Sequence, residues 1–184
     1  MGCSIKSVYC ICIAGLIGSG KSTLSRRLSE QFDAVNVSFG EYVRILARGL
    51  GEDLSRERLQ ALGNQLILEN NIDSFVTNVL SFYLQSGEKR EAVIEGVCHR
   101  SIWNAISNLT AKSALIYIDI EDEVRLKRVI NRDGLTADDV ELSFNNEMEI
   151  NAKCLREDAS LILKNDDVEG WVESVVKFMQ TIIL

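Results

Sequence analysis

Short apolar runs alternate with stretches of helical spacing along most of the chain. The run at positions 8–14, VYCICIA, is β-branched and almost without polar residues, which predicts a strand buried on both faces. Four further runs of this kind predict strands at 34–39, 92–97, 114–120 and 160–164. The two cysteines of the first run are two positions apart, so a strand would direct both to the same side.

Residues with helical spacing fill the intervals between these runs. We expect helices at 22–31, 41–50, 56–70, 73–84, 101–109, 121–131, 136–158 and 171–183. The seventh of these opens on Thr136 and Asp139, which have the spacing of a capping box. Strands that alternate with helices predict an α/β three-layer sandwich with a mostly parallel sheet. No repeat or low-complexity linker interrupts the pattern, so residues 1–184 are predicted to form a single domain.

Composition and charge narrow the classes of partner. The 184 residues have a formal net charge of −7, which argues against nucleic acid as the main partner but allows a small anion in a local basic pocket. No apolar run is long enough to span a membrane, so no membrane partner is expected. The five cysteines form no CxxC pair, and one histidine cannot complete a zinc set. Reduced cysteines of this kind are typical of a cytoplasmic protein.

The segment GLIGSGKS at positions 15–22 matches the phosphate-binding pattern G-x-x-x-x-G-K-[ST] in full. It lies between a predicted buried strand and a predicted helix, which is the context that the pattern requires. Gly15, Gly18 and Gly20 let the backbone approach a phosphate without a Cβ atom in the way. The amides from Gly18 through Ser19 and Gly20 to Ser22 are then expected to point at one anion, at the start of a helix.

The side chains that end this segment predict ATP and Mg²⁺ as cofactors. We expect Lys21 to bridge the β- and γ-phosphates, Ser22 to offer its hydroxyl to Mg²⁺, and Thr23 to reach the α-phosphate. The alternative is a glycine-rich turn that carries a surface lysine.

With these motifs, nearly the whole chain resembles the small P-loop kinases of the nucleoside-monophosphate-kinase type, and more narrowly the adenylate/cytidylate-kinase-like proteins often labelled AAA-family ATPase. The resemblance rests on six segments: AGLIGSGKST, SFGEYVR, SRERLQALGNQLI, VIEGVCHR, VRLKRVINRD and the ending ASLILKN at 159–165. It implies a five-stranded parallel sheet, an acceptor-binding helical region at about 40–85 and a short lid at about 125–140. It also places the loop at Asn165 and Asp166 near the donor base.

The same resemblance implies a site at the end of the third strand. In such kinases a D-G-x-R motif puts a carboxylate near Mg²⁺ and an arginine near the acceptor phosphate. Glu95 takes the place of the aspartate, and its longer arm favours contact with Mg²⁺ through water. Cys98 takes the place of the arginine, so Arg100 is a candidate substitute, and His99 is interpreted as a wall residue or an acceptor contact. The alternative is that Cys98 and His99 only end a strand.

Arginines supply the remaining candidates. Arg44 matches the family's acceptor-phosphate arginine, although a solvated helix face would also explain it. Arg125, Arg128 and Arg132 share one helix stripe, and Arg128 and Arg132 match the catalytic lid arginines best. Ion pairing with nearby acidic residues is the alternative for all three, and it suits Arg125 in particular.

Together these features predict an ATP-dependent phosphotransferase, with a nucleoside or deoxynucleoside monophosphate as the favoured acceptor. The second strand ends in SFG without an aspartate, and Glu41 is its nearest carboxylate, which favours an acceptor that is already anionic. The missing arginine at Cys98 favours the alternatives, a hydroxyl kinase of the dephospho-coenzyme A kinase type or a nucleotide-binding regulatory ATPase. The oligomeric state stays open, a homodimer included.

Overall fold

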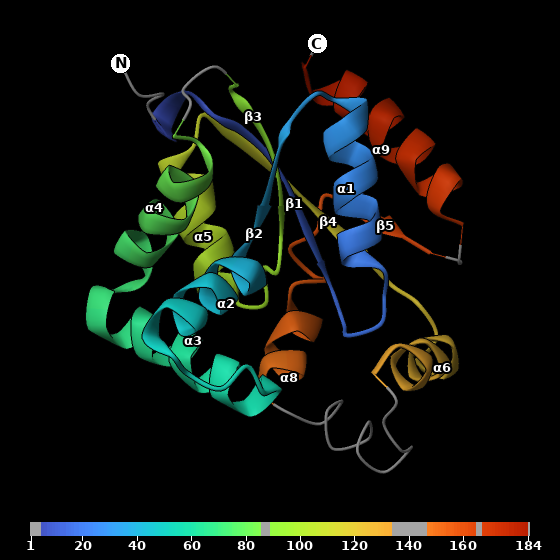
Figure 1. The fold of residues 1–184 in the computed structure, drawn as a ribbon. Coiled ribbons are helices and arrows are strands. Elements are labelled where there is room, and N and C mark those ends of the chain that lie inside the picture. The colour runs from blue at the N-terminus through green and yellow to red at the C-terminus, as the bar shows by residue number, and fades with distance from the viewer. Residues whose placement is uncertain (1–4, 86–88, 134–146, 165–166, 184) are drawn as a thin grey trace.

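The computed structural model describes residues 5–85, 89–133, 147–164 and 167–183. A five-stranded parallel sheet forms its centre, in the order β2-β3-β1-β4-β5 (Figure 1). The strands are β1 (Tyr9–Gly15), β2 (Val35–Ser38), β3 (Glu91–Glu95), β4 (Lys112–Ile118) and β5 (Leu161–Leu163). The predicted strands and the parallel sheet are therefore confirmed.

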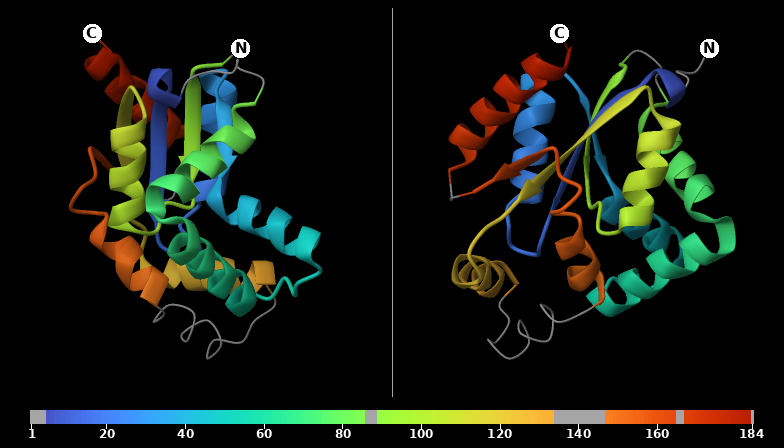
Figure 2. Two further views of the ribbon diagram at one scale, coloured as in Figure 1. Left: turned by 90° about the vertical axis from the view of Figure 1, so that its left-hand side faces the viewer. Right: turned by 180° about the vertical axis from the view of Figure 1, so that it is seen from behind.

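Helices cover both faces of the sheet, and α6 and α8 lie beyond the carboxyl ends of its strands (Figures 1 and 2). The described elements are η1 (Ile5–Ser7), α1 (Lys21–Gln31), α2 (Phe39–Leu50), α3 (Arg56–Asn70), α4 (Ile72–Tyr83), α5 (Arg100–Leu109), α6 (Asp122–Asp133), α8 (Glu147–Cys154) and α9 (Val168–Ile183). No helix among these described residues is long and apolar enough to cross a membrane.

Two predicted helix boundaries need correction: α9 begins at Val168 rather than Trp171, and the helix before β5 ends early. The helix expected at 136–158 ends at Cys154 rather than Asp158. The next four amides, from Leu155 to Asp158, bond to the carbonyls three residues back, so the chain winds into tight turns before β5. Thr136 and Asp139, the expected capping pair, lie outside the described residues, as does the part of the predicted lid beyond 133.

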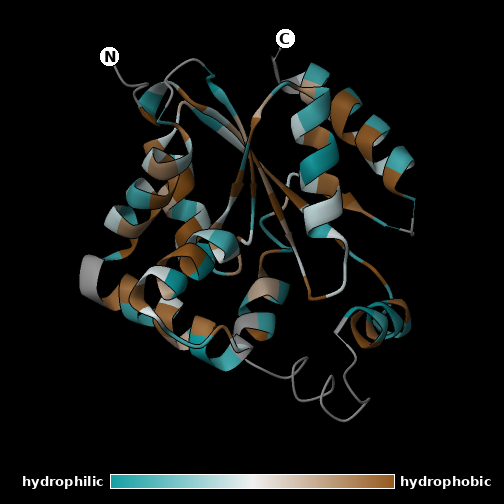
Figure 3. Ribbon diagram, in the orientation of Figure 1, coloured by the Kyte–Doolittle hydropathy of each residue, from teal (hydrophilic) through white to brown (hydrophobic). Residues whose placement is uncertain are grey.

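Two hydrophobic clusters, one on each face, bury the sheet. Alternation along β1 divides its side chains between them: Cys10 and Cys12 lie in one cluster, and Ile11 and Ile13 in the other. The first cluster packs the sheet against α2, α4 and α5, and the second against α1 and α9. The brown, apolar colour of the strands in Figure 3 reflects this burial from both sides.

The central position of β1 determines where a ligand can bind. β1 pairs with β3 on one side and with β4 on the other, and the chain then leaves through the glycine-rich loop into α1. In an open parallel sheet, ligands usually bind at the carboxyl ends of two neighbouring strands whose following connections run to opposite sides of the sheet. The loop at 15–20 lies at this point, between α6 and α8 (Figures 1 and 2).

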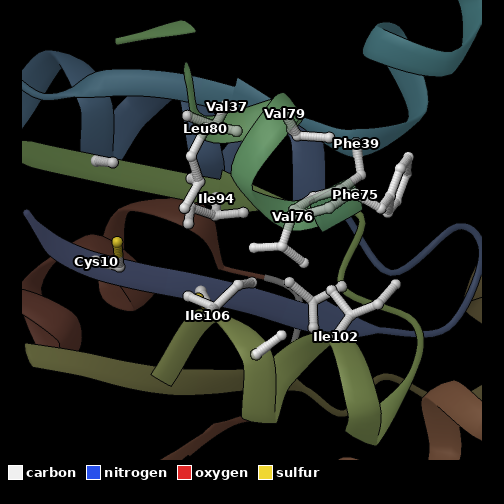
Figure 4. Packing of buried hydrophobic residues seen from close by; sticks show 14 of the residues in the cluster. Cys10, Val37, Phe39, Phe75, Val76, Val79, Leu80, Ile94, Ile102 and Ile106 are labelled. Carbon is white, nitrogen blue, oxygen red and sulfur yellow. The ribbon is translucent and has the colours of Figure 1, made fainter. Parts of the chain in front are cut away.

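We predict that Ile94→Ala lowers the free energy of unfolding by about 3 kcal/mol, because it opens a cavity in a closely packed core. Ile94 is fully buried and packs near Val76 and Leu80 of α4 (Figure 4). Chemical denaturation measures the change. Leu68→Ala on α3 is the matched control, since Leu68 is 85% exposed, and it should shift the value by less than about 0.5 kcal/mol. Equal effects of the two substitutions would contradict this packing.

Candidate active site

The glycine-rich loop has the backbone shape that its sequence predicts. Gly15, Gly18 and Gly20 have φ angles of 146°, 77° and 97°, which residues other than glycine rarely adopt. A Cβ atom on Gly18 would lie 2.7 Å from the carbonyl oxygen of Arg125 in α6, so a side chain is also excluded there by contact. Ser19 is buried, and its hydroxyl makes no hydrogen bond within the described part of the chain.

Lys21 folds back over this loop. Its Nζ donates hydrogen bonds of 2.8 Å to the carbonyl oxygens of Gly15 and Leu16. Burial lowers the pKa of Lys21 below the ordinary lysine value, and the nearby carboxylates of Glu149 and Glu95 partly offset that effect. The ammonium group therefore faces a site where an added anion would stabilise its charge.

Glu95 closes the carboxyl end of β3 between two serines. Its Oε2 accepts a hydrogen bond of 2.6 Å from the hydroxyl of Ser22, and its Oε1 accepts one of 2.7 Å from Ser38. A hydroxyl and a carboxylate are hard oxygen ligands, and Mg²⁺ bound with a nucleotide needs only one or two of these from the protein. The described residues contain no cluster of three or more acidic, histidine or cysteine side chains for a metal held by protein alone. The pair Ser22 and Glu95 thus fits a nucleotide-bound Mg²⁺.

Two cavities meet at the loop. The smaller, of about 540 Å³, is lined by Ile17, Gly18, Gly20, Lys21, Ser22, Thr23, Arg128, Arg132, Val168 and Trp171. The larger, of about 660 Å³, lies between the loop, α2, α3, α5 and α8, and its wall includes Phe39, Arg44, Gln60, Asn64, Cys98, His99 and Glu149. Ile17, Lys21 and Arg132 line both. Ligands in the two cavities would therefore meet at these three residues.

The predicted arginine stripe of α6 faces the loop. Arg125 is only 3% exposed and donates from Nη1 to the carbonyl oxygen of Ile17 at 3.0 Å, while Asp122 pairs with its other nitrogens. Nη1 of Arg128 donates to the carbonyl oxygen of Gly18 at 3.2 Å, on the wall of the smaller cavity. Ion pairing of Arg125 was the expected alternative, and its pairing with Asp122 agrees with it.

The residues predicted around the acceptor separate into two groups. Arg44, Cys98 and His99 line the larger cavity, where His99 Nε2 lies 2.8 Å from Asn151 Nδ2 of α8. Burial raises the pKa of the Cys98 thiol to about 11, which does not suit a nucleophile. Arg100 is not on the cavity wall: its Nε pairs with Asp158 at 2.5 Å and its Nη2 with Glu157 at 3.4 Å. Its placement gives the predicted acceptor role no support and indicates an anchor for the segment after α8.

A match to a known protein family shows which family the chain belongs to. Residues 14–144 match the family model described as AAA domain, a span that includes the glycine-rich loop, the helices from α1 to α5, and α6, but not α8. The chain belongs to this AAA-domain family of P-loop proteins. The chain is also 30% identical over 128 residues to a cytidylate kinase of Pyrobaculum calidifontis, a match that covers 70% of this chain and 62% of that protein. The chain thus spans less than two thirds of that relative's length.

Solved structures share the fold of this chain. The protein TT1252 of Thermus thermophilus has a TM-score of 0.64 at 20% identity, over 96% of this chain and 98% of its own. Shikimate kinase of Aquifex aeolicus has a TM-score of 0.59 at 15% identity, over 95% and 98% of the two chains. These TM-scores show that the chain has the three-layer α/β fold of the nucleotide-kinase type, with the five-stranded parallel sheet that the resemblance implied.

Glu149 is a residue of the site that the sequence did not reveal. Its carboxylate oxygens accept from the backbone amide of Ile17 at 2.9 and 3.1 Å, and Oε2 lies 3.7 Å from Arg125 Nη1. It stands among Asn and Glu residues in NNEMEIN, which looks like a solvated helix face.

Asn165 and Asp166, expected near the donor base, lie outside the described residues. The Nε1 of Trp171 donates to the adjacent Lys164 carbonyl, and Trp171 lines the smaller cavity.

We predict that Gly18→Ala in this AAA domain weakens ATP binding at least about tenfold, because the added Cβ meets the backbone of α6 at a φ of 77°. Titration calorimetry with ATP and Mg²⁺ measures the change. Gly49→Ala is the control: a Cβ on Gly49 meets nothing within 4 Å, and its ATP affinity should equal that of the unaltered protein. Unchanged affinity in Gly18→Ala would show that the loop can relax away from α6.

Proposed function

We propose that the protein is an ATP-dependent phosphotransferase and that its acceptor is a nucleoside or deoxynucleoside monophosphate. The observation that carries this proposal is the shared wall of the two cavities, formed by Ile17, Lys21 and Arg132. A phosphoryl group moves between two ligands only when donor and acceptor oxygens lie in line and close together. ATP in the smaller cavity and an acceptor in the larger one would meet at this wall.

The charged and polar groups at this wall and beside it each have a role in such a transfer. The loop amides and Lys21 would hold the phosphate tail, and Arg128 and Arg132 would face the negative charge that spreads over the transferred group. Ser22 and Glu95 would hold Mg²⁺. When it is bound, Mg²⁺ neutralises charge on the phosphate oxygens. Because a phosphate acceptor is already anionic, these residues need only to position and neutralise, and no strong base is required.

The larger cavity suits an acceptor of nucleotide type. Arg44 on its wall is a cation that could bind the acceptor's phosphate, although Glu41 pairs with it at 2.5 Å. Phe39 and Phe75 offer aromatic surface to a base, and the amides of Gln60 and Asn64 can both donate and accept hydrogen bonds. The cytidylate kinase relative supports the same acceptor class.

One observation favours a second candidate, a kinase that acts on a hydroxyl group. Glu149 places a carboxylate on the wall of the larger cavity, next to the loop. Such a carboxylate could accept the proton of an attacking hydroxyl.

An acceptor panel tests the proposal. The protein is incubated with ATP and Mg²⁺ alone, then with ribo- and deoxyribonucleoside monophosphates, dephospho-coenzyme A and shikimate, and ADP release is measured. We expect release that depends on one of the monophosphates. Release that depends on a hydroxyl acceptor would support the second candidate. Hydrolysis that no acceptor changes would indicate a regulatory ATPase and contradict both.

We predict that Lys21→Ala lowers kcat/KM for ATP at least about 100-fold, because the phosphate charge loses its closest ammonium partner. Steady-state kinetics with the acceptor from the panel measures this ratio. Lys127→Ala on α6 is the control, because Lys127 is exposed and pairs only loosely with Glu123 at 3.5 Å. Turnover that survives in Lys21→Ala would be incompatible with the donor site assigned here.

We predict that Arg44→Ala raises KM for the acceptor about 10- to 100-fold and leaves KM for ATP nearly unchanged, as expected for a charge-assisted hydrogen bond to the acceptor phosphate. Arg48→Ala is a matched control: Arg48 also pairs with Glu41, at 3.2 Å, but does not line the cavity. If both KM values rise together in Arg44→Ala, the arginine does not act on the acceptor.

A further inference from the structure

The peptide groups at Ile17 are held from both sides by one ion pair. Glu149 of α8 accepts from the Ile17 amide, and Arg125 of α6 donates to the Ile17 carbonyl oxygen. The two side chains lie 3.7 Å apart and are almost inaccessible to solvent, at 11% exposure for Glu149 and 3% for Arg125. Two helices on opposite sides of the loop therefore fix the same residue, which lines both cavities.

Burial of these charges has a cost that only close pairing offsets. Arg125 meets that requirement with Asp122, Glu149 and the Ile17 carbonyl, and Glu149 meets it with Arg125 and the Ile17 amide. Both Glu149 oxygens face the amide of Ile17, and Oε2 also faces Arg125, so the carboxylate is held against the loop. The arrangement restrains the loop backbone at the point where it must present its amides to phosphates.

We propose that Glu149 is a positioning residue of the donor site, which pre-organises the phosphate-binding loop through Ile17 with Arg125 as its partner. This inference rests on the proposed function only in that the loop binds ATP. A loop already in its binding conformation does not lose conformational freedom when the nucleotide arrives, so affinity is higher. Glu149 acts in spite of its negative charge, which by itself would repel the phosphate tail.

The test compares Glu149→Gln and Glu149→Asp with Glu157→Gln. Glutamine keeps an acceptor for the Ile17 amide but loses the charge that Arg125 requires, and aspartate keeps the charge on a shorter arm. Glu157 is the control, because its side chain is 81% exposed and its contact with Arg100 is long, at 3.4 Å. Two quantities are measured: ATP affinity by calorimetry with Mg²⁺, and the hydrogen-exchange rate of the Ile17 amide by NMR without nucleotide.

In both Glu149 variants we expect ATP binding to weaken about tenfold or more and the Ile17 amide to exchange at least about tenfold faster. The amides of β1 and the Glu157 control should be unchanged. A general loss of stability would accelerate the β1 amides as well and would overturn the positioning role. Unchanged ATP binding together with unchanged exchange of the Ile17 amide would overturn it as well. Tighter ATP binding with unchanged Ile17 exchange would show that Glu149 acts only as a repelling charge, and this too would overturn the proposal.

Failure of the proposed function is a separate outcome. If the unaltered protein binds no ATP, the phosphotransferase proposal fails, and the exchange rates without nucleotide still decide whether Glu149 holds the loop. If the unaltered protein binds ATP and the variants bind it equally well, only the role of Glu149 fails.

Discussion

The partly buried ammonium group of Lys21 is the constraint around which the site is organised. Burial makes its charge costly and lowers its pKa, so the surrounding structure must supply negative or dipolar partners. The carbonyl oxygens of Gly15 and Leu16 supply two of them directly, and the carboxylates of Glu149 and Glu95 act at longer range. A polyphosphate would be a stronger partner for the ammonium group than these carbonyls and distant carboxylates. Lys21 would therefore favour an anion at the loop.

The ends of two strands and two helices bring the groups of the site together. β1 lies in the middle of the sheet, and the loop follows it at the crevice where the strand order reverses. β3 ends beside it and brings Glu95 to Ser22, while α6 and α8 approach from beyond the strand ends. The core is formed by two apolar clusters that need no polar residue of the site. The charged groups of the site lie outside these clusters, whereas core residues such as Phe39 and Phe75 also line the larger cavity.

Much of this could be predicted from the sequence because the signals are local. The loop motif, the apolar strands and the arginine stripe of α6 each lie within one short segment, and each was found where it was expected. Glu149 could not be found in this way, since it lies 132 positions from Ile17 and gains its partner only through the packing of α8. The partners of Arg100 were missed for the same reason: Asp158 is 58 positions away. The premature end of α8 had no glycine or proline to mark it.

The pKa of the Lys21 amine tests most directly whether this loop binds the phosphate tail of ATP. Its pKa can be followed by NMR of ¹³C-labelled lysine side chains, with Lys21→Arg to assign the signal. Without nucleotide, we expect Lys21 to titrate below the ordinary lysine value, because burial disfavours the charged form. With ATP and Mg²⁺ the pKa should rise, because the phosphates stabilise the ammonium ion. A Lys21 pKa that saturating ATP leaves unchanged would contradict phosphate binding beside this ammonium group.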